Sequence, residues 1–177
     1  MPSFNVKKFV TEVREAANNP GASRDIRQIM SKTMEELDAV NDAFSSYGNA
    51  DKVLFEDDGI SIWYCAFDPT VHVPPHDHQT TATIGVIGGI EHNHFYQKTS
   101  TKLQYKSTKS LSAGDVIAIG PDGIHSVETE GNQHSYAIHI YQAPLTTIKR
   151  SLFEWETGAA CPFNDDNYAL MVRSSTT

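Results

Sequence analysis

The chain has 177 residues, a net charge of −8 and an apolar fraction of 39%. This length fits one domain with one hydrophobic core, and 10% aromatic residues argue against disorder. The negative charge disfavours nucleic acid and anionic membrane surfaces as partners. The N-terminus carries no long apolar stretch, so we expect neither a signal peptide nor a transmembrane helix, and a cytoplasmic location. Cys65 and Cys161 form neither a metal spacing nor a disulfide framework.

Two amphipathic helices are expected in an N-terminal helical segment, residues 1–48. The first covers residues 4–17 and is broken by Asn18-Asn19-Pro20-Gly21. The second covers about residues 23–43, where apolar residues recur on one helical face and the Ser45 to Asn49 stretch ends the pattern.

From residue 52 onward, short β-rich runs alternate with turn residues. The expected strands are residues 52–56, 60–67, 70–78, 82–88, 90–97, 102–107, 115–119, 124–129 and 134–142. Many closely spaced strands predict a sandwich or a small barrel. We therefore expect an all-β single domain over residues 1–177. Its barrel should span residues 52–145, and a C-terminal segment, 146–177, should wrap it with one short helix near 147–154.

Three histidines form a candidate metal site. His76 and His78 lie two apart in Pro75-His76-Asp77-His78, and a strand would point both to the same face. His125 ends the phrase that begins at Gly114 and follows the turn Pro121-Asp122-Gly123. A third imidazole from a neighbouring strand would complete one face of an octahedron. Positions would remain open for substrate and O2, which suits a redox metal better than a closed structural site does.

The order of these phrases resembles the two cupin motifs over roughly residues 52–145. This resemblance implies a double-stranded β-helix (a jelly-roll barrel) with the metal inside one mouth. The usual first motif carries a glutamate where this chain has Ala82 or Thr83. In the second motif two residues normally separate glycine and histidine, whereas here only Ile124 does. The missing glutamate points to a three-histidine subgroup that resembles the thiol dioxygenases of the cysteine dioxygenase type.

A further phrase, Ala137-Ile138-His139-Ile140-Tyr141, strengthens this similarity. In cysteine dioxygenases a Ser-x-His-x-Tyr strand lies beside the iron, so the resemblance implies catalytic roles for Tyr141 and His139. The chain is also similar to predicted metal-dependent, cysteine-dioxygenase-like cupins, which share four phrases with it. These phrases are Pro75 to His78, Gly89 to Tyr96, Ile124 to Val127 and Ile138 to Tyr141.

The arginines bear on the substrate. Cysteine dioxygenases hold the substrate carboxylate with an arginine upstream of the metal strand, but here no arginine falls on the expected strands between 52 and 142. This puts free cysteine in doubt as the substrate. Arg150 follows the last core strand and could reach the mouth, although an ordinary surface or helix position is the simpler expectation. Thr83 takes the place of the family's crosslinked cysteine, so that crosslink cannot form.

The strand after Gly89 has two faces with different expected roles. Glu91 and Asn93 share one face and either point inward, where they would orient a ligand histidine, or face solvent. His92 and His94 share the opposite face and are not expected to bind this ion.

Two neighbours of the ligand pair are also expected to lie outside the coordination sphere. His72 lies at even spacing before His76 and is expected to line the mouth. Asp77 points away from the histidines and is expected to be a surface carboxylate.

The resemblance implies a mononuclear non-heme Fe(II) dioxygenase that oxidises a small thiol to a sulfinate with O2. Zn, Ni or Mn are alternative metals. Alternative functions are a dioxygenase that cleaves a carbon–carbon bond of a diketone-type substrate, an isomerase or lyase, and a non-catalytic cupin that binds a small ligand. The expected partners are a small-molecule substrate and O2, without nucleic acid or membrane, and a homodimer is compatible with the family.

Overall fold

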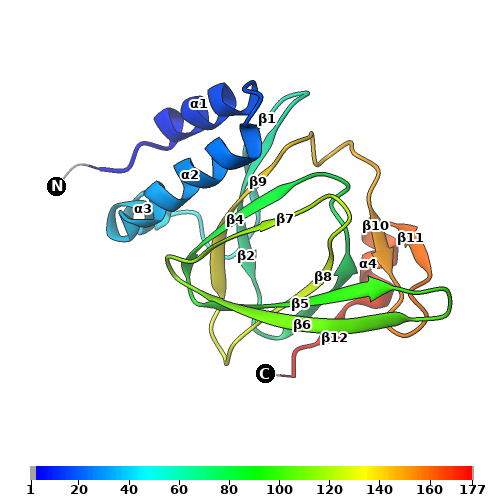
Figure 1. The fold of residues 1–177 in the computed structure, drawn as a ribbon. Helices are drawn as coiled ribbons and strands as arrows, with labels where there is room; N and C mark the ends of the chain where they lie inside the picture. The colour runs from blue at the N-terminus through cyan, green and yellow to red at the C-terminus, as the bar shows by residue number, and fades with distance from the viewer. Residues whose placement is uncertain (1–2, 177) are drawn as a thin grey trace.

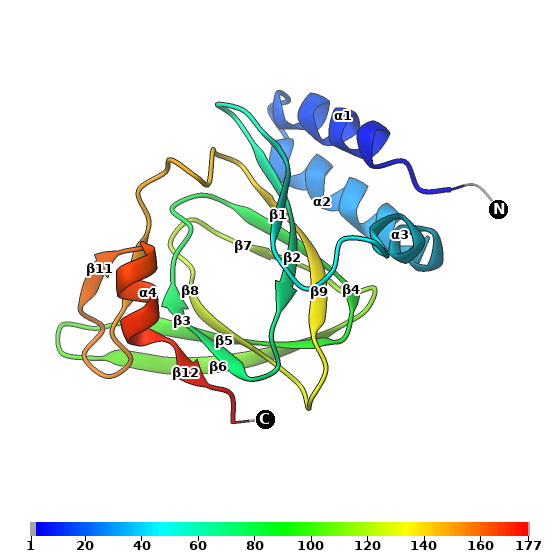
Figure 2. The ribbon, with the colours of Figure 1, turned by 180° about the vertical axis from the view of Figure 1, so that it is seen from behind.

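The computed structural model describes residues 3–176, which form two antiparallel β-sheets facing each other (Figures 1 and 2). The five-stranded sheet has the order β1-β2-β9-β4-β7. Its strands are β1 (Lys52–Glu56), β2 (Ser61–Phe67), β9 (Ser135–Tyr141), β4 (Ala82–Gly88) and β7 (Val116–Ile119).

The seven-stranded sheet has the order β11-β10-β3-β8-β5-β6, with β12 paired to β3 outside this path. Its strands are β11 (Ala160–Pro162), β10 (Ser151–Phe153), β3 (Val71–His76), β8 (Ile124–Thr129), β5 (Ile90–Lys98), β6 (Leu103–Ser112) and β12 (Arg173–Ser174).

The chain crosses repeatedly between the two sheets. Strands β2, β4, β7 and β9 belong to the five-stranded sheet, whereas β3, β5, β6 and β8 belong to the other. This antiparallel exchange is the double-stranded β-helix of the cupin fold, which confirms the predicted barrel. Within residues 3–176, no helix is long and apolar enough to cross a membrane.

The fold is mixed rather than purely β, and the predicted N-terminal helices are present, although they number three rather than two. Three helices are present there: α1 (Val6–Ala17), α2 (Ala22–Met34) and α3 (Leu37–Phe44). The second predicted helix divides because the N–H groups of Glu35 and Glu36 bond three residues back, which tightens and ends α2. The sequence hides this break because neither glycine nor proline marks it.

The helices lie against the outer face of the five-stranded sheet, where α2 packs on β4 and β7 (Figure 1). Burial of Ile26, Met30 and Val40 against this face forms one hydrophobic core. Gly85 of β4 permits the close approach, because a Cβ there would lie 2.5 Å from Met30 Sδ. A second core fills the interior between the sheets.

The C-terminal segment contributes β10, β11, β12 and helix α4 (Asp165–Met171). The helix predicted near 147–154 is absent, because the chain there extends and Leu152 pairs with His76 of β3. Asp77 is buried rather than on the surface. Its Oδ1 accepts a hydrogen bond from the Ser151 N–H at 2.9 Å, which ties this segment to the barrel.

Candidate metal centre

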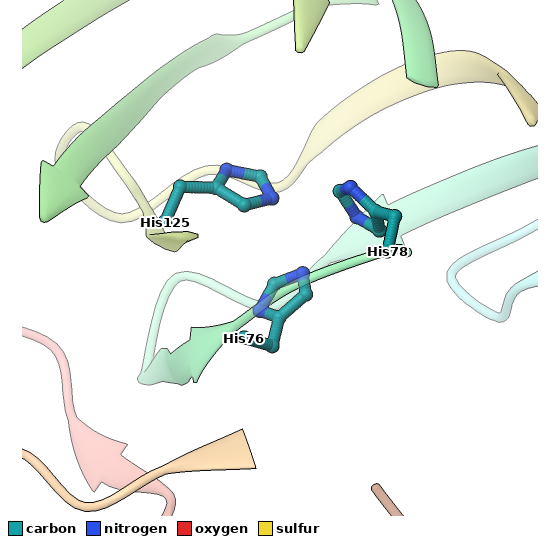
Figure 3. A group of neighbouring side chains, drawn as sticks. All are labelled: His76, His78 and His125. Atoms are coloured by element: carbon teal, nitrogen blue, oxygen red, sulfur yellow. The ribbon is translucent and has the colours of Figure 1, made fainter. Parts of the chain in front are cut away.

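Three imidazoles gather inside the barrel at the end of β3 (Figure 3). His76 ends β3 and pairs directly with His125 of β8, while His78 follows β3 by two residues. One ring nitrogen from each histidine lies within 4.8 Å of the others. The ring centroids are 4.5–5.0 Å apart, and all three side chains are buried.

A β-bulge in β3 sets which histidines face inward. Val73 pairs with Val127 and His76 with His125, so three steps along β3 match two along β8. The extra residue falls at Pro74-Pro75, where proline is tolerated in a strand, and it reverses the alternation of side chains. Both Val73 and His76 therefore line the interior.

The bulge also corrects the expectation for His72. Even spacing from His76 predicted the same face, but the bulge places His72 on the outer face of the sheet. There its Nε2 lies 2.8 Å from Ser126 Oγ.

Hydrogen bonds orient two of the three inner rings. His76 Nδ1 donates to the Pro74 carbonyl at 2.9 Å, and His125 Nδ1 donates to Asn93 Oδ1 at 2.9 Å. These bonds leave Nε2 of each ring as the free nitrogen. Among the described residues, His125 Nε2 and His78 Nδ1 are buried without a hydrogen-bond partner. Buried nitrogens without partners are costly, and a metal ion would satisfy them.

The inner imidazoles are held in the neutral form that metal binding requires. Burial outweighs the opposing Pro74 hydrogen bond and, together with the smaller effect of the Arg150 charge, lowers the pKa of His76 to about 4. Burial, followed by the neighbouring histidines, lowers the pKa of His78 and His125 well below the ordinary value.

Asn93 and Glu91 face the barrel interior rather than the solvent, the two orientations that the sequence left open. Both are fully buried, and Asn93 contacts His125. Glu91 Oε1 accepts a hydrogen bond from Ser135 Oγ at 3.4 Å. Burial raises the pKa of Glu91 to about 7. On the opposite face of β5, His92 and His94 lie away from the three inner rings.

On β9, Tyr141 and His139 lie beside the three inner histidines. The Tyr141 ring centroid is 5.1 Å from that of His78, and Tyr141 Oη is 2.8 Å from His139 Nδ1. Burial raises the pKa of Tyr141 well above 10, so its hydroxyl keeps its proton. Burial lowers the pKa of His139 to about 3, so its ring is neutral.

These side chains line a cavity of about 380 Å³. Most of its wall is apolar or aromatic, although the carboxylates of Asp51, Asp68 and Asp165 also line it. The wall includes Trp63, Cys65, Phe67, Val71, Val73, Val127, Leu145, Phe163 and Tyr168 in addition to the three histidines, His139, Tyr141 and Arg150. A volume of this size accommodates a small molecule.

Arg150 belongs to the cavity wall rather than to the outer surface or a helix. Its guanidinium lies 3.7 Å from the centroid of the Phe163 ring. Within residues 3–176 it makes no ion pair and no side-chain hydrogen bond, although Tyr141 and Asp77 act to raise its pKa. Burial opposes this effect and lowers the Arg150 pKa overall. The sequence left both positions open for Arg150. The β10–β11 hairpin decides for the cavity wall, because the Phe163 N–H bonds the Arg150 carbonyl at 3.0 Å.

The comparisons with known proteins give distant structural matches only. No protein-family model and no curated protein matches the sequence. A solved structure of DMSP lyases is 10% identical with a TM-score of 0.43, covering 54% of this chain and 44% of the lyase. The match therefore spans less than half of the lyase chain.

Two bacterial proteins give similar values. An uncharacterised double-stranded β-helix protein from Klebsiella pneumoniae is 18% identical with a TM-score of 0.45, covering 59% of this chain and 80% of that one. A cupin superfamily protein from Desulfitobacterium hafniense is 15% identical with a TM-score of 0.43, covering 52% and 75%. The strand order of the chain itself defines the fold.

The residues described here fit a divalent metal. Three neutral imidazoles from one side leave the remaining coordination positions directed at the cavity, an arrangement suited to Fe(II), Ni(II), Mn(II) or Zn(II). The buried three-histidine group could therefore hold a catalytic rather than a closed structural ion.

Proposed function

We propose that this protein is a mononuclear non-heme iron dioxygenase that converts a small anionic thiol to its sulfinate. The balanced reaction is RSH + O2 → RSO2H. The observation that carries the proposal is the shared cavity, because His76, His78 and His125 line the same 380 Å³ space as the guanidinium of Arg150.

Arg150 supports an anionic group on the substrate. A buried guanidinium presents five N–H donors in a planar fork that matches a carboxylate. Phe163 stacks on one face of this fork and holds it in the cavity wall. The carboxylate of a bound substrate would provide the hydrogen-bond acceptors that the described residues do not provide. Arg150 could therefore be the carboxylate-binding arginine, although no arginine falls on the expected strands between 52 and 142.

Tyr141 and His139 supply a hydrogen-bond donor at the reacting end. Neutral His139 carrying its proton on Nδ1 donates to Tyr141 Oη and holds the phenol in place. The Tyr141 hydroxyl proton is then free to point into the cavity, toward substrate sulfur or oxygen. Iron held by the three histidines would favour the thiolate form of the substrate and supply the redox chemistry that O2 requires. The apolar and aromatic part of the wall would limit the access of water to the reacting groups.

The test is oxygen consumption by iron-loaded protein with paired thiols. Thiols with a carboxylate (cysteine, 3-mercaptopropionate) are compared with matched thiols without one (cysteamine, 2-mercaptoethanol). We expect uptake of one O2 per sulfinate formed, identified by mass spectrometry, with the carboxylated thiols preferred. Absence of uptake with every thiol would contradict the proposal, and uptake with diketones instead would identify the carbon–carbon cleaving alternative.

An Arg150→Met variant tests whether the Arg150 charge binds the substrate carboxylate. We expect KM for a carboxylated thiol to rise roughly 10- to 100-fold, which corresponds to about 1.5–3 kcal/mol for a charged hydrogen bond. The uncharged thiol should show little change. Arg150→Lys is the matched control, because it keeps the charge but loses the planar fork, and it should fall between the two. An equal loss for both thiols would show that Arg150 only supports the wall.

A further inference from the structure

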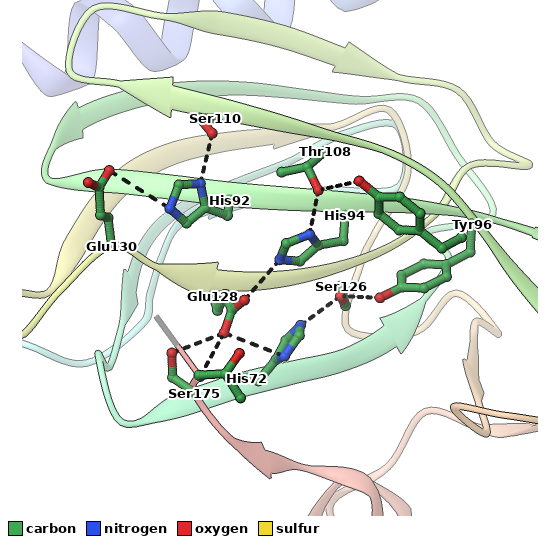
Figure 4. Close-up of polar contacts among 12 residues, drawn as sticks. His72, His92, His94, Tyr96, Thr108, Ser110, Ser126, Glu128, Glu130 and Ser175 are labelled. Carbon is green, nitrogen blue, oxygen red and sulfur yellow. Dashed lines mark hydrogen bonds and ion pairs between the residues drawn. The ribbon is translucent and has the colours of Figure 1, made fainter.

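A second group of metal-ligating side chains lies on the opposite face of the same sheet (Figure 4). His72 of β3, His94 of β5 and Glu128 of β8 come from three adjacent strands, and we call them the outer histidine cluster. Their ligand atoms lie within 4.8 Å of one another. Because side chains alternate along a strand, these residues point away from the cavity that holds His76 and His125.

The distances in the cluster approach those of a metal site. His94 Nε2 lies 3.0 Å from Glu128 Oε1, and His72 Nδ1 lies 3.5 Å from Glu128 Oε2. Neighbouring ligand atoms on a tetrahedral Zn²⁺ ion with ordinary bond lengths lie about 3.4 Å apart. The two imidazole centroids are 5.3 Å apart, so both rings flank one carboxylate.

The far nitrogen of each ring is fixed by a hydroxyl group on a neighbouring strand. His72 Nε2 lies 2.8 Å from Ser126 Oγ, and His94 Nδ1 lies 2.6 Å from Thr108 Oγ1. Metal-binding histidines commonly have their second nitrogen held in this way, which fixes the ring orientation. The two nitrogens left for an ion both face Glu128 (Figure 4).

Glu128 provides a buried negative charge. It is 3% exposed, and its Oε2 accepts hydrogen bonds from Ser175 Oγ at 3.0 Å and the Thr176 N–H at 3.2 Å. Within residues 3–176 its only ion-pair partners are the two cluster histidines. The nearby Arg173 guanidinium instead lies 4.6 Å from the centroid of the Trp155 ring. Oε1 is thus left to His94 and to an ion.

We propose that the outer histidine cluster is a second divalent-cation site of the Zn²⁺ class. Two imidazole nitrogens and one carboxylate oxygen would bind the ion, with water in the fourth position. The ion would link β3, β5 and β8, and it would secure the C-terminal residues that Glu128 holds. The partly exposed rings of His72 and His94 give the ion access from solvent. This site is independent of the proposed oxygenase chemistry.

The test is Zn²⁺ titration by calorimetry on tag-free protein stripped with a chelator. A His78→Ala background removes the inner site. We expect two Zn²⁺ per wild-type chain, one for His78→Ala and none for His78→Ala with His94→Gln. His92→Gln is the matched control in the same background. It lies on the same face of β5 but bonds Ser110 and Glu130 outside the cluster, so it should keep one Zn²⁺.

Thermal unfolding gives a second reading. Saturating Zn²⁺ should raise the melting temperature of His78→Ala by several degrees and leave the His78→Ala/His94→Gln variant unchanged, since a ligand stabilises only a state that binds it. One Zn²⁺ in the wild type and none in His78→Ala would overturn the outer site and leave the inner one intact. One Zn²⁺ in both, lost with His94→Gln, would support the outer site while contradicting the inner one.

Discussion

The two faces of β3, β5 and β8 carry imidazoles in contrasting settings. Inside the barrel, three rings meet without a carboxylate, and among the described residues two of their nitrogens have no partner. On the outer face, two rings flank Glu128, and their second nitrogens have hydroxyl partners. An ion inside would keep its full charge and open positions, which favours chemistry. An ion outside would be partly neutralised and held by three strands, which favours stability.

The largest expected effect comes from removing one ring from each face. His78→Ala should lose the inner ion and all oxygen consumption, because two imidazoles no longer enclose the site. His94→Gln should keep at least half of the activity, because its side chain lies on the other face. Elemental analysis and an oxygen electrode measure both variants. Equal loss of activity in the two would show that the faces are not independent.

The sequence predicted the fold and the inner cluster because both follow from local patterns. Alternating strands, the turn at Pro121-Asp122-Gly123 and the His76-Asp77-His78 spacing are visible in the chain. The break between α2 and α3 was missed because the apolar period continues across it. The placement of His72 was missed because a bulge reverses the side-chain alternation without changing the residue spacing, and Pro74-Pro75 was its only local sign.

The cavity wall was the least predictable part. Arg150 reaches it because Asp77 bonds the Ser151 N–H and β10 pairs with β3, which are contacts between residues more than 70 positions apart. No periodicity or motif reports such contacts. The same contacts explain why Asp77 is buried, although its position between two inward histidines suggested a surface carboxylate.

A second test concerns the donor that only the inner face has. Tyr141→Phe removes the hydroxyl that lies beside His139. We expect kcat to fall about 100-fold, since loss of one positioned donor commonly costs two orders of magnitude or more, while metal content stays constant. Tyr136→Phe, on the same strand but bonded to Asn49, should leave kcat unchanged. Unchanged kcat in Tyr141→Phe would assign the phenol a packing role.

A third test concerns how each face orients its rings. Asn93→Leu removes the acceptor for His125 Nδ1 at similar volume, and should weaken the inner metal affinity by roughly 10- to 100-fold. Asn93→Asp keeps an acceptor oxygen and should stay within a few-fold of wild type. Competition with a chromophoric chelator measures both. Unchanged affinity in Asn93→Leu would mean that strand packing, not the hydrogen bond, orients His125.

The smallest expected effect concerns the protons that the metal-free protein takes up on unfolding, to which the two faces contribute differently. The pKa of His76 is about 4 when folded and about 6.5 when unfolded, so unfolding binds a proton between these values. The stabilisation by neutral His76 is complete above pH 6.5 and is lost as pH falls toward 4. Burial alone would raise the pKa of Glu128, but its hydrogen bonds and His72 together lower it. The stabilisation of the fold by ionised Glu128 is therefore lost only as the pH falls below about 4.5, its unfolded pKa.

Urea unfolding in chelator between pH 7 and 5 therefore reports on the buried histidines. These include His72 of the outer face, whose pKa burial also lowers, so variants are needed to isolate His76. At about pH 5.3, midway between its folded and unfolded pKa values, His76 should contribute nearly one proton, which corresponds to about 1.4 kcal/mol per pH unit, or a tenfold change in the unfolding equilibrium. His76→Gln should flatten the slope by that amount. Glu128→Gln removes a charge that raises the pKa of His72, so it should not flatten the slope over this range. A flattened slope in Glu128→Gln alone would mean that the outer carboxylate, rather than the inner rings, couples folding to protons near neutral pH.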